Sequence, residues 1–301
     1  MQAINKAKAK IRPIESFSVL PTWIVTFTHI GTAARGASYI ATVLKDFFLL
    51  QYLRKFKFLK IPLVHVDHPL DKKIPFTPSR IGNYMSFVSY WIKPLTMMIK
   101  TLGTKRSLPL LERYYKTIKK SYRAASSIYR TCMSTTDRPH YKRRIYFAAI
   151  HMLDPHYMCV PSLHISVIIL CIAFFNDLFK KNYWSKEQTQ VWQKEIYQGG
   201  VRIAETVLYV KQHSVNCVPA AAYMMCRVIP DLFTKQDALD FLDSLFIDAG
   251  DIKAGDAAQI KSHMKNLFCT FYEQGAAAEK PADKWNEPVT AWLKEKMLIN
   301  S

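Results

Sequence analysis

Residues 158–175 read MCVPSLHISVIILCIAFF, and this stretch decides the fold class. Pro161 and Ser162 stand before its longest apolar run, and both residue types are common where a helix begins. The run that follows is apolar on every side, which is typical of a helix buried inside a protein. It carries His164 and two hydroxyl groups, and it falls short of the roughly 20 uninterrupted apolar residues of a membrane span. We therefore interpret it as a buried core helix, with a polar-bearing membrane helix as the alternative.

The rest of the chain also predicts helices, because no period-2 alternation is long enough to require a sheet. The expected helices span residues 33–56, 81–102, 109–131, 143–153, 161–179, 186–211, 213–229 and 284–298, and another begins at 234–237. The prolines between residues 61 and 80 predict a loop. The expected fold is all-α, a helical bundle with an additional C-terminal helical segment. Since the composition changes after Pro230, we expect a body over residues 1–230 and an acidic helical subdomain over residues 231–301.

Charge is unevenly distributed along the 301 residues, which carry a net charge of +19. The first 230 residues hold 34 Lys/Arg against 11 Asp/Glu, whereas the last 71 hold 8 against 12. The basic part suits an anionic partner, either a phosphate-bearing lipid, a membrane surface or nucleic acid. The sequence contains no motif of a nucleic-acid-binding fold, so we expect no nucleic acid. Residues 53–60 (LRKFKFLK) interleave basic and apolar residues and favour peripheral membrane association, with a solvated helix end as the alternative.

The cellular compartment is constrained by cysteine spacing and by the first apolar run. The six cysteines form no C-x-x-C pair, so we expect free thiols and a reducing compartment. Residues 17–27 follow basic residues as in a signal sequence, but Pro21 favours a buried or interfacial segment. We expect a membrane-associated protein, or a cytoplasmic one if the chain is soluble.

Two histidines, His164 and His213, are the leading candidates for chemistry. A single histidine on an apolar helix is usually a core residue, but both have phosphate-binding residue types beside them. His164 follows Ser162 at an expected helix N-terminus, where unpaired N–H groups and the helix dipole favour an anion. His213 follows Lys211. Imidazole can act as nucleophile and as acid near neutral pH, so the pair suits phosphoryl transfer.

A basic segment over residues 129–139 supplies further phosphate ligands. It contains Arg130 and Arg138 with hydroxyl residues between them, and Lys142, Arg143 and Arg144 follow. Arginine binds phosphate through two parallel hydrogen bonds, which suits a group whose charge develops during transfer. A solvated basic face is the alternative interpretation.

These elements resemble the type 2 phosphatidic acid phosphatase superfamily, whose motifs are K-x6-R-P, P-S-G-H and S-R-x5-H-x3-D. Arg138-Pro139, Pro161-Ser162-Leu163-His164 and Lys211-Gln212-His213 follow each other in that order. The resemblance is closest to the sphingomyelin and inositol phosphorylceramide synthases, where P-S-L-H and K-Q-H are common. Residues 129–139 and 71–76 (DKKIPF) are similar to further elements of that branch. The resemblance covers about residues 60–230.

The resemblance implies a helical catalytic body that works without metal or cofactor. His213 would be the nucleophile that forms a phosphohistidine, and His164 the acid that protonates the leaving group. Arg138 would bind the phosphate, helped by Arg130, Lys211 and Ser162.

The third motif departs most from the family pattern. Thr131 stands where the first motif has Lys, Leu163 replaces Gly, and Val207 replaces Arg. Cys217 stands where the family has the Asp that orients the nucleophilic imidazole; in a comparable triad, loss of this carboxylate lowers the rate by about 10⁴. Four acidic residues are candidates to replace it: Asp67, Asp71, Asp154 and Glu205. Glu205, about two helical turns before His213, is the weakest candidate.

Three other clusters have a competing interpretation. His65-Val66-Asp67-His68 and residues 151–156 (HMLDPH) have metal-ligand types, but neither has a helical i, i+4 pair, so we expect no metal. Lys73 and Arg80 have K-x6-R spacing and rank second for the first motif. The aromatic and Met residues of 84–98 predict core or the wall of a lipid-tail pocket.

The sequence therefore predicts a phosphatase or phosphotransferase that acts on a lipid or prenyl phosphate or diphosphate. One alternative is a lipid-binding protein whose site has decayed. Another is an enzyme on the same scaffold that converts a prenyl diphosphate by ionising it.

Overall fold

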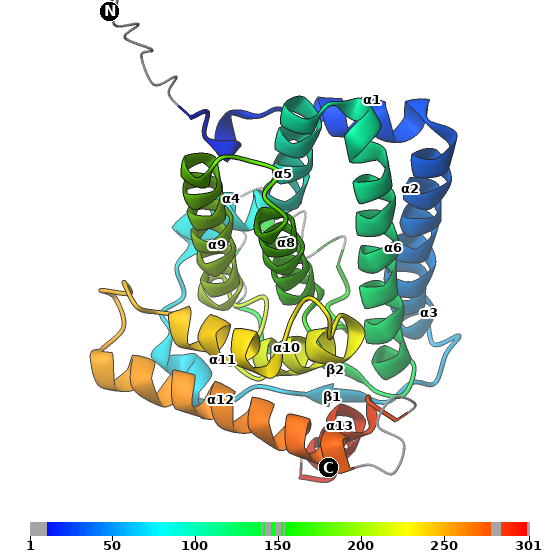
Figure 1. Cartoon of the computed structure of the whole chain (residues 1–301). Helices are drawn as coiled ribbons and strands as arrows, with labels where there is room; N and C mark the ends of the chain where they lie inside the picture. Colours follow the sequence, from blue (N-terminus) through cyan, green and yellow to red (C-terminus); the bar gives the residue numbers. More distant parts are fainter. Residues whose placement is uncertain are drawn as a thin grey trace, which may run out of the picture.

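The fold is known from a computed structural model that describes residues 11–139, 141, 146–147, 152, 154–277 and 284–299. These residues are predominantly helical, which confirms the all-α class (Figure 1). The α-helices are α1 (Leu20–Thr28), α2 (Ile30–Val43), α3 (Leu50–Lys55), α4 (Ile81–Met85), α5 (Phe87–Leu102), α6 (Thr104–Tyr129), α8 (Leu163–Lys180), α9 (Lys186–Tyr209), α10 (Cys217–Val228), α11 (Lys235–Ser244), α12 (Ala254–Ala277) and α13 (Glu287–Ile299). The short turns are η1 (Ile14–Ser16), η2 (Leu44–Leu49), η3 (Pro69–Lys73) and η4 (Pro78–Arg80).

Helix α8 is the core of the bundle, as its apolar sequence predicts. It packs against α5, α6, α9 and α10, so nearly all of its side chains are buried (Figure 1). Among the described residues it is the one helix long and apolar enough to cross a membrane, yet 78% of it is buried inside the protein. Ser162 caps its first turn by accepting a hydrogen bond from the N–H of Ile165. The expected helix start is therefore confirmed.

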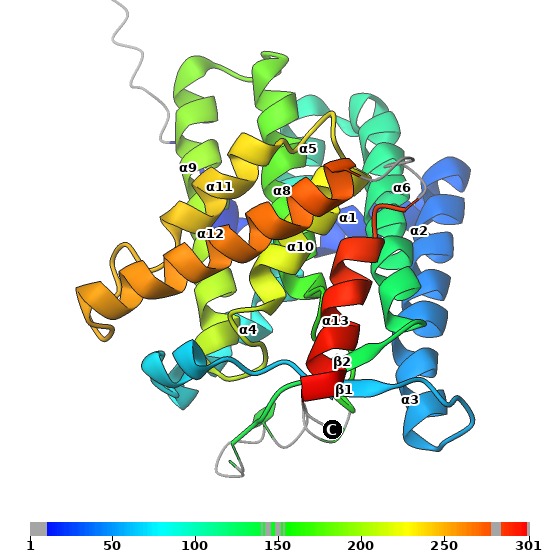
Figure 2. The same cartoon turned by 90° about the horizontal axis from the view of Figure 1, so that it is seen from below.

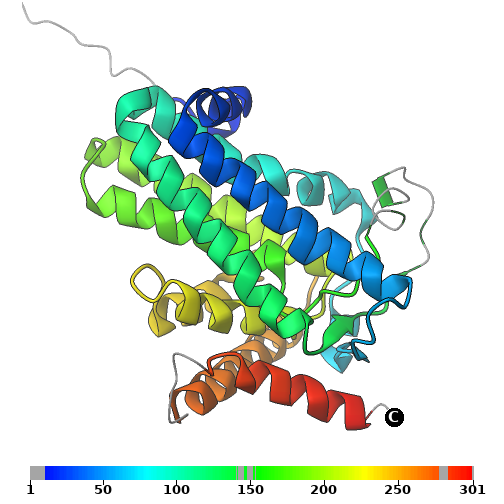
Figure 3. The ribbon, with the colours of Figure 1, turned by 90° about the vertical axis from the view of Figure 1, so that its right-hand side faces the viewer.

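The N-terminal helices form one long rod beside α6. Helix α2 continues through the π-helical turn η2 into α3, where the sequence predicted a single helix over residues 33–56. The rod starts at Ile30, earlier than expected. Figure 3 shows α2 lying along α6 on the face turned to the viewer. Helix α1 precedes this rod and contains the run for which we expected a buried or interfacial segment.

Two short strands join loops that are far apart in the sequence. Strand β1 (Leu63–His65) pairs in parallel with β2 (Met133–Thr135), and Val64 lies opposite Ser134. Three residues are too few to show period-2 alternation, so this sheet could not be predicted from the sequence. The pairing holds the loop after β1 beside the loop after β2, and the N–H of Asp137 donates to the carboxylate of Asp67.

The acidic C-terminal helices α11, α12 and α13 pack on the underside of the body (Figure 2). The side chain of Thr234 caps α11, as its sequence predicts. Phe268 and Phe271 of α12 belong to the same buried cluster as Tyr223 of α10. Apolar packing therefore ties these helices to the rest of the chain.

Ion pairs add to this docking. Lys73 lies 3.1 Å from Asp256, and Arg80 lies 3.0 Å from Asp251. These two basic residues have the K-x6-R spacing that ranked second for the first family motif. The structure places them at the contact with the C-terminal segment. The opposite charges of the two parts of the chain therefore meet within the molecule.

Candidate functional site

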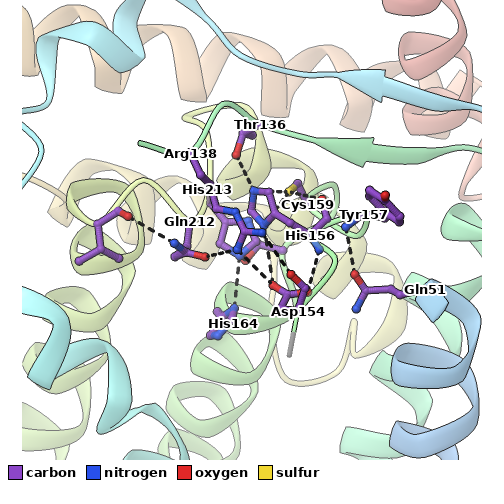
Figure 4. A network of polar contacts seen from close by, with 12 residues as sticks. Gln51, Thr136, Arg138, Asp154, His156, Tyr157, Cys159, His164, Gln212 and His213 are labelled. Atoms are coloured by element: carbon purple, nitrogen blue, oxygen red, sulfur yellow. Dashed lines mark hydrogen bonds and ion pairs between the residues drawn. The ribbon is translucent and has the colours of Figure 1, made fainter. Parts of the chain in front are cut away.

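His164 and His213, 49 positions apart in the sequence, are in direct contact. Nδ1 of His164 lies 3.2 Å from Nε2 of His213 (Figure 4). His164 is in the first turn of α8, whereas His213 lies in the turn between α9 and α10. The sequence predicted that a helix begins at His213, but α9 ends at Tyr209 and Lys211 adopts a positive φ of 56°. This reversal turns the backbone so that His213 points back at the start of α8.

Ser162 completes the contact on the helix side. Its hydroxyl lies 3.1 Å from Nε2 of His213 and also caps α8. The Ser162 side chain is fully buried, and the backbone N–H of Ser162 donates to the carbonyl of Cys217 at 3.4 Å. The N-terminus of an apolar helix, a hydroxyl and two imidazoles thus converge, which is an arrangement that favours an anion.

The other ring nitrogen of His213 lacks the partner that the family motif would supply. Nδ1 is buried and makes no hydrogen bond of ordinary geometry to the described residues, although the backbone of Cys159 lies close enough to the His213 ring to raise its pKa. Cys217 is fully buried, and burial raises the pKa of its thiol, so it supplies no anion. A buried polar atom without a partner costs about 1–3 kcal/mol, which makes this nitrogen an unusual feature.

The four candidate carboxylates are engaged elsewhere. Asp71 accepts from the N–H groups of His68 and Val215. Asp67 accepts from the N–H of Asp137, and Glu205 accepts from the N–H of Phe246. Asp154 contacts Arg138 and His156. Nδ1 of His213 therefore donates a hydrogen bond to none of them.

Burial keeps both histidines neutral. It lowers the pKa of His164 to about 4, with the charge of Asp154 opposing the shift. Burial also lowers the pKa of His213 far below its usual value, and the neighbouring His164 and His156 lower it further. A neutral imidazole keeps the lone pair that a nucleophile needs. An incoming phosphate would raise both pKa values, because its negative charge stabilises imidazolium.

Arg138 lies next to the histidine pair, as the sequence predicts. Its guanidinium donates to the side-chain oxygen of Gln212 at 3.1 Å and to the carbonyl of Asp154 at 3.1 Å (Figure 4). The carboxylate of Asp154 lies 4.0 Å from it. Burial lowers the pKa of Arg138, and the charge of Asp154 opposes this shift. A fixed, partly desolvated guanidinium beside His213 suits phosphate binding.

The structure does not bring Arg130 and Lys211 to the histidines. Arg130 lies at the end of α6 and pairs with Asp46 at 2.8 Å. Lys211 donates to the carbonyls of Asp71 and Ile74, which directs its ammonium towards η3. Because the backbone reverses at Lys211, its side chain and that of His213 leave in different directions. Lys211 therefore holds a loop in place.

A third histidine lies beside the pair, and the sequence did not single it out as catalytic. The rings of His156 and His213 are 6.5 Å apart between centroids. Nε2 of His156 lies 2.7 Å from the hydroxyl of Thr136, and its Nδ1 lies 3.8 Å from Asp154. Burial alone would raise the pKa of Asp154, but His156 and Arg138 outweigh it and hold the pKa at about 2. The sequence signal was the cluster at residues 151–156 (HMLDPH), which was considered for metal binding.

An apolar cavity of about 390 Å³ opens onto these histidines. His156, His164, Gln212, His213 and Asp154 supply its polar lining. The remaining walls are mostly aromatic and aliphatic and come from α1, α2, η2, α3, α4, α5, α6, the start of α8 and the segment before it: Trp23, Tyr39, Ile40, Val43, Leu44, Phe47, Phe48, Gln51, Tyr84, Phe87, Val88, Trp91, Tyr122, Met158 and Leu163. The expectation that residues 84–98 line a pocket agrees with four of these. A cavity with one polar end and apolar walls suits an amphipathic ligand.

Of the clusters considered for metal binding, His65 and Asp67 lie apart from this lining, whereas Asp154 and His156 of the second cluster belong to it. Ligand atoms of His65, Asp67 and Asp137 lie within 4.8 Å of one another, and all three are accessible to solvent. Of the cluster at 151–156, His151 lies outside the described residues. Lys142, Arg143 and Arg144 also lie outside the described residues.

Comparisons with known proteins return nothing: no family model, no curated protein and no solved structure matches this chain. The function is therefore argued from the geometry of the site and from the resemblance of its motifs.

Proposed function

We propose that this chain is a metal-independent phosphatase or phosphotransferase that acts on a lipid or prenyl phosphate through His213. The contact between His164 and His213 at the polar end of an apolar cavity carries this proposal. The contact of Ser162 with His213 and that of Arg138 with the adjacent Gln212 support a role for both side chains in holding the phosphate. The apolar walls then take the tail, so one cavity accounts for both halves of the substrate.

The reaction follows from the two ring nitrogens that meet. Nε2 of His213 attacks phosphorus, and the bond from phosphorus to the ester oxygen breaks. His164, once protonated, gives its proton to the leaving oxygen. Water or an acceptor alcohol then attacks the phosphohistidine and loses its proton to His164, and the phosphorus–nitrogen bond breaks. Since the rings are now 3.2 Å apart at these atoms, His164 must rotate to admit the phosphoryl group.

Electrostatics favours each role once the phosphate is bound. The low pKa of His213 keeps it neutral for attack. Burial also makes His164 a poor base, but a neighbouring phosphate dianion raises its pKa and allows it to carry the transferred proton. Arg138 stabilises the charge on the phosphoryl oxygens as they separate from the leaving group.

A prenyl diphosphate converted to a new carbon skeleton is a second candidate function, favoured by the aromatic walls. Trp23, Phe47, Phe87 and Trp91 line the cavity. Their ring faces would stabilise a carbocation formed when diphosphate leaves. In this reaction His164 would still serve as the acid, whereas His213 would not become phosphorylated.

A lipid-binding protein with a decayed site is the third candidate, favoured by the missing partner of His213 Nδ1. Nucleophilic attack through Nε2 requires the proton on Nδ1, where a carboxylate normally holds it. If no group takes over this task, the cavity would bind its ligand without turning it over.

The experiment is a search for a phosphorylated enzyme. The purified chain is mixed with radiolabelled lipid and prenyl phosphates, quenched, and tested for label that is stable in alkali and labile in acid, as phosphohistidine is. We expect label in the wild type and in His164→Ala, where the intermediate would accumulate with an activated leaving group. We expect none in His213→Ala.

Product analysis separates the candidates. A prenyl alcohol with inorganic phosphate supports the phosphatase, and a new phosphate monoester of the acceptor alcohol supports the transferase. A hydrocarbon with inorganic diphosphate would support carbon-skeleton conversion. Ligand binding without any product in the wild type would refute both enzymes and leave the binding protein.

A further inference from the structure

The rod formed by α2, η2 and α3 presents an apolar face to solvent. Residues 30, 34, 37, 41, 44 and 48 recur at helical spacing, and all six are apolar and exposed. Ile30 is 92% exposed and Leu44 is 57% exposed. The opposite side of the rod, with Thr32, Gly36 and Tyr39, is buried against the bundle. The rod thus places an apolar stripe where a surface helix normally has polar residues.

Neighbouring elements extend this stripe at both ends. Helix α1 adds Leu20, Ile24 and Phe27, and the turn after α3 adds Phe56 and Phe58, all more than half exposed. In Figure 3, α1 lies at one end of α2, and the turn after α3 lies at the other. Contiguous exposed apolar area of this kind marks an interaction site.

The stripe contains the mouth of the cavity. Ile40, Leu44 and Phe48 line the cavity and are also exposed on the surface, as is Val88 of α5. A tail that enters between these residues would reach the histidines at the polar end. The apolar surface and the cavity are therefore continuous.

Basic residues flank the apolar stripe. Arg35, Lys45, Lys55, Lys57 and Lys60 are exposed in the same segment. From residue 20 to residue 60 the chain has six Lys/Arg and one acidic residue, Asp46, which is paired with Arg130. Apolar and basic side chains interleaved at one surface match the chemistry of an anionic lipid bilayer.

We propose that the face formed by α1, α2, η2 and α3 docks on an anionic lipid bilayer and opens the cavity directly into it. The apolar stripe enters the interfacial layer, and the lysines contact the headgroups. Delivery of a lipid substrate through this mouth rests on the proposed function, but bilayer binding does not. A protein partner is less suited, because it would need an apolar face with an acidic rim. The acidic helices of this chain already pack against its body elsewhere.

Co-sedimentation of the full chain with vesicles tests the proposal. The vesicles contain phosphatidylcholine alone or phosphatidylcholine with phosphatidylserine. We expect strong binding to the second type, weakened about ten-fold or more by Ile30→Gln with Phe58→Ser, because these apolar side chains would leave the interfacial layer. Ile247→Gln is the matched control, since Ile247 is 67% exposed and lies on the C-terminal segment. It should bind as the wild type does.

Two further measurements separate binding from catalysis and from folding. Lys55→Gln with Lys57→Gln should weaken binding by about five-fold per lysine, whereas Lys100→Gln with Lys186→Gln should not. His213→Ala should bind vesicles as the wild type does, because docking requires no turnover. Thermal melting of each variant shows that the fold is intact, since all these positions are exposed apart from His213.

The proposal fails if the wild type does not bind phosphatidylserine vesicles, or if Ile247→Gln weakens binding as much as the double variant. It also fails if the chain is a dimer that Ile30→Gln dissociates, because the stripe would then join two copies. If the wild type binds phosphatidylserine vesicles but turns over no lipid or prenyl phosphate, the proposed function alone is refuted.

Discussion

The pair formed by His164 and His213 differs from the adjacent loop cluster in how the imidazoles are held. The loop cluster consists of Thr136, Asp154 and His156. His164 and His213 contact each other and a hydroxyl, and Nδ1 of His213 has no partner among the described residues. In the loop cluster, His156 has Thr136 on one ring nitrogen and Asp154 beside the other. Asp154, one of the candidates to replace the carboxylate of the family motif, therefore lies beside a different histidine. His156, engaged at both ring nitrogens, is placed to orient its neighbours, whereas Nε2 of His213 faces His164 and Ser162 at the polar end of the cavity.

The largest effect should come from removing the reactive imidazole. We expect His213→Ala to lower kcat about 10⁴-fold or more, because the nucleophile is lost. His156→Ala should lower it only about ten-fold, since His156 acts through Asp154 and Arg138. Steady-state phosphate release measures both, and labelled phosphoenzyme should persist in His156→Ala. Equal losses in the two variants would erase the distinction between the regions.

A second effect is the dependence of the free energy of unfolding on pH. Burial lowers the pKa of His164 to about 4 in the folded state, from 6.5 when exposed. The unfolded chain therefore binds the proton more readily, so stability is fully present above pH 6.5 and is lost as the pH falls towards 4. The contribution is on the order of 3 kcal/mol.

Denaturant unfolding across this pH range checks the effect. The free energy of unfolding of His164→Gln should fall less steeply on acidification, with about one fewer proton taken up on unfolding. A slope equal to that of the wild type would show that His164 is not buried as a neutral ring.

A third prediction compares the two arginines of the basic segment. Arg138→Ala should lower kcat/KM about 100-fold, because a fixed guanidinium beside the phosphate is lost. Arg130→Ala is its control, since Arg130 pairs with Asp46 instead of facing the histidines. It should leave the rate of phosphate release from a soluble substrate unchanged. A similar loss in both variants would mean that Arg130 reaches the phosphate.

Features of this molecule that depend on local interactions could be predicted from the sequence, whereas features that depend on long-range contacts could not. The buried helix from Leu163 to Lys180 and its Ser162 cap could be predicted, because apolar runs and caps are local signals. So could the meeting of His164 and His213, through motif order. The two three-residue strands could not, since only long-range pairing creates them.

Side-chain direction was the main obstacle at the site. Lys211 is two residues from His213, but the positive φ at Lys211 sends its ammonium to the carbonyls of Asp71 and Ile74. Proximity in sequence therefore misassigned it to the phosphate. The partner of Asp154 likewise depended on the loop that places His156 and Arg138 around it. Residue types predict which functional groups a site contains, whereas backbone turns decide which of those groups come into contact.

The smallest effect would come from supplying the missing carboxylate. We expect Cys217→Asp to raise kcat about ten-fold, because a carboxylate at the position of the family's Asp would hold the proton on Nδ1 of His213 while Nε2 attacks. Cys217→Asn is the matched control, with the same shape and no charge. The gain should be smaller than the 10⁴-fold effect of the carboxylate in established triads, because Cys217 is fully buried and an anion there is costly to desolvate. A rise in kcat for Asp but not Asn would mark the histidine pair as a weakened nucleophilic site. No rise, with folding intact, would mean that the pair works without a carboxylate, in contrast to the neighbouring His156.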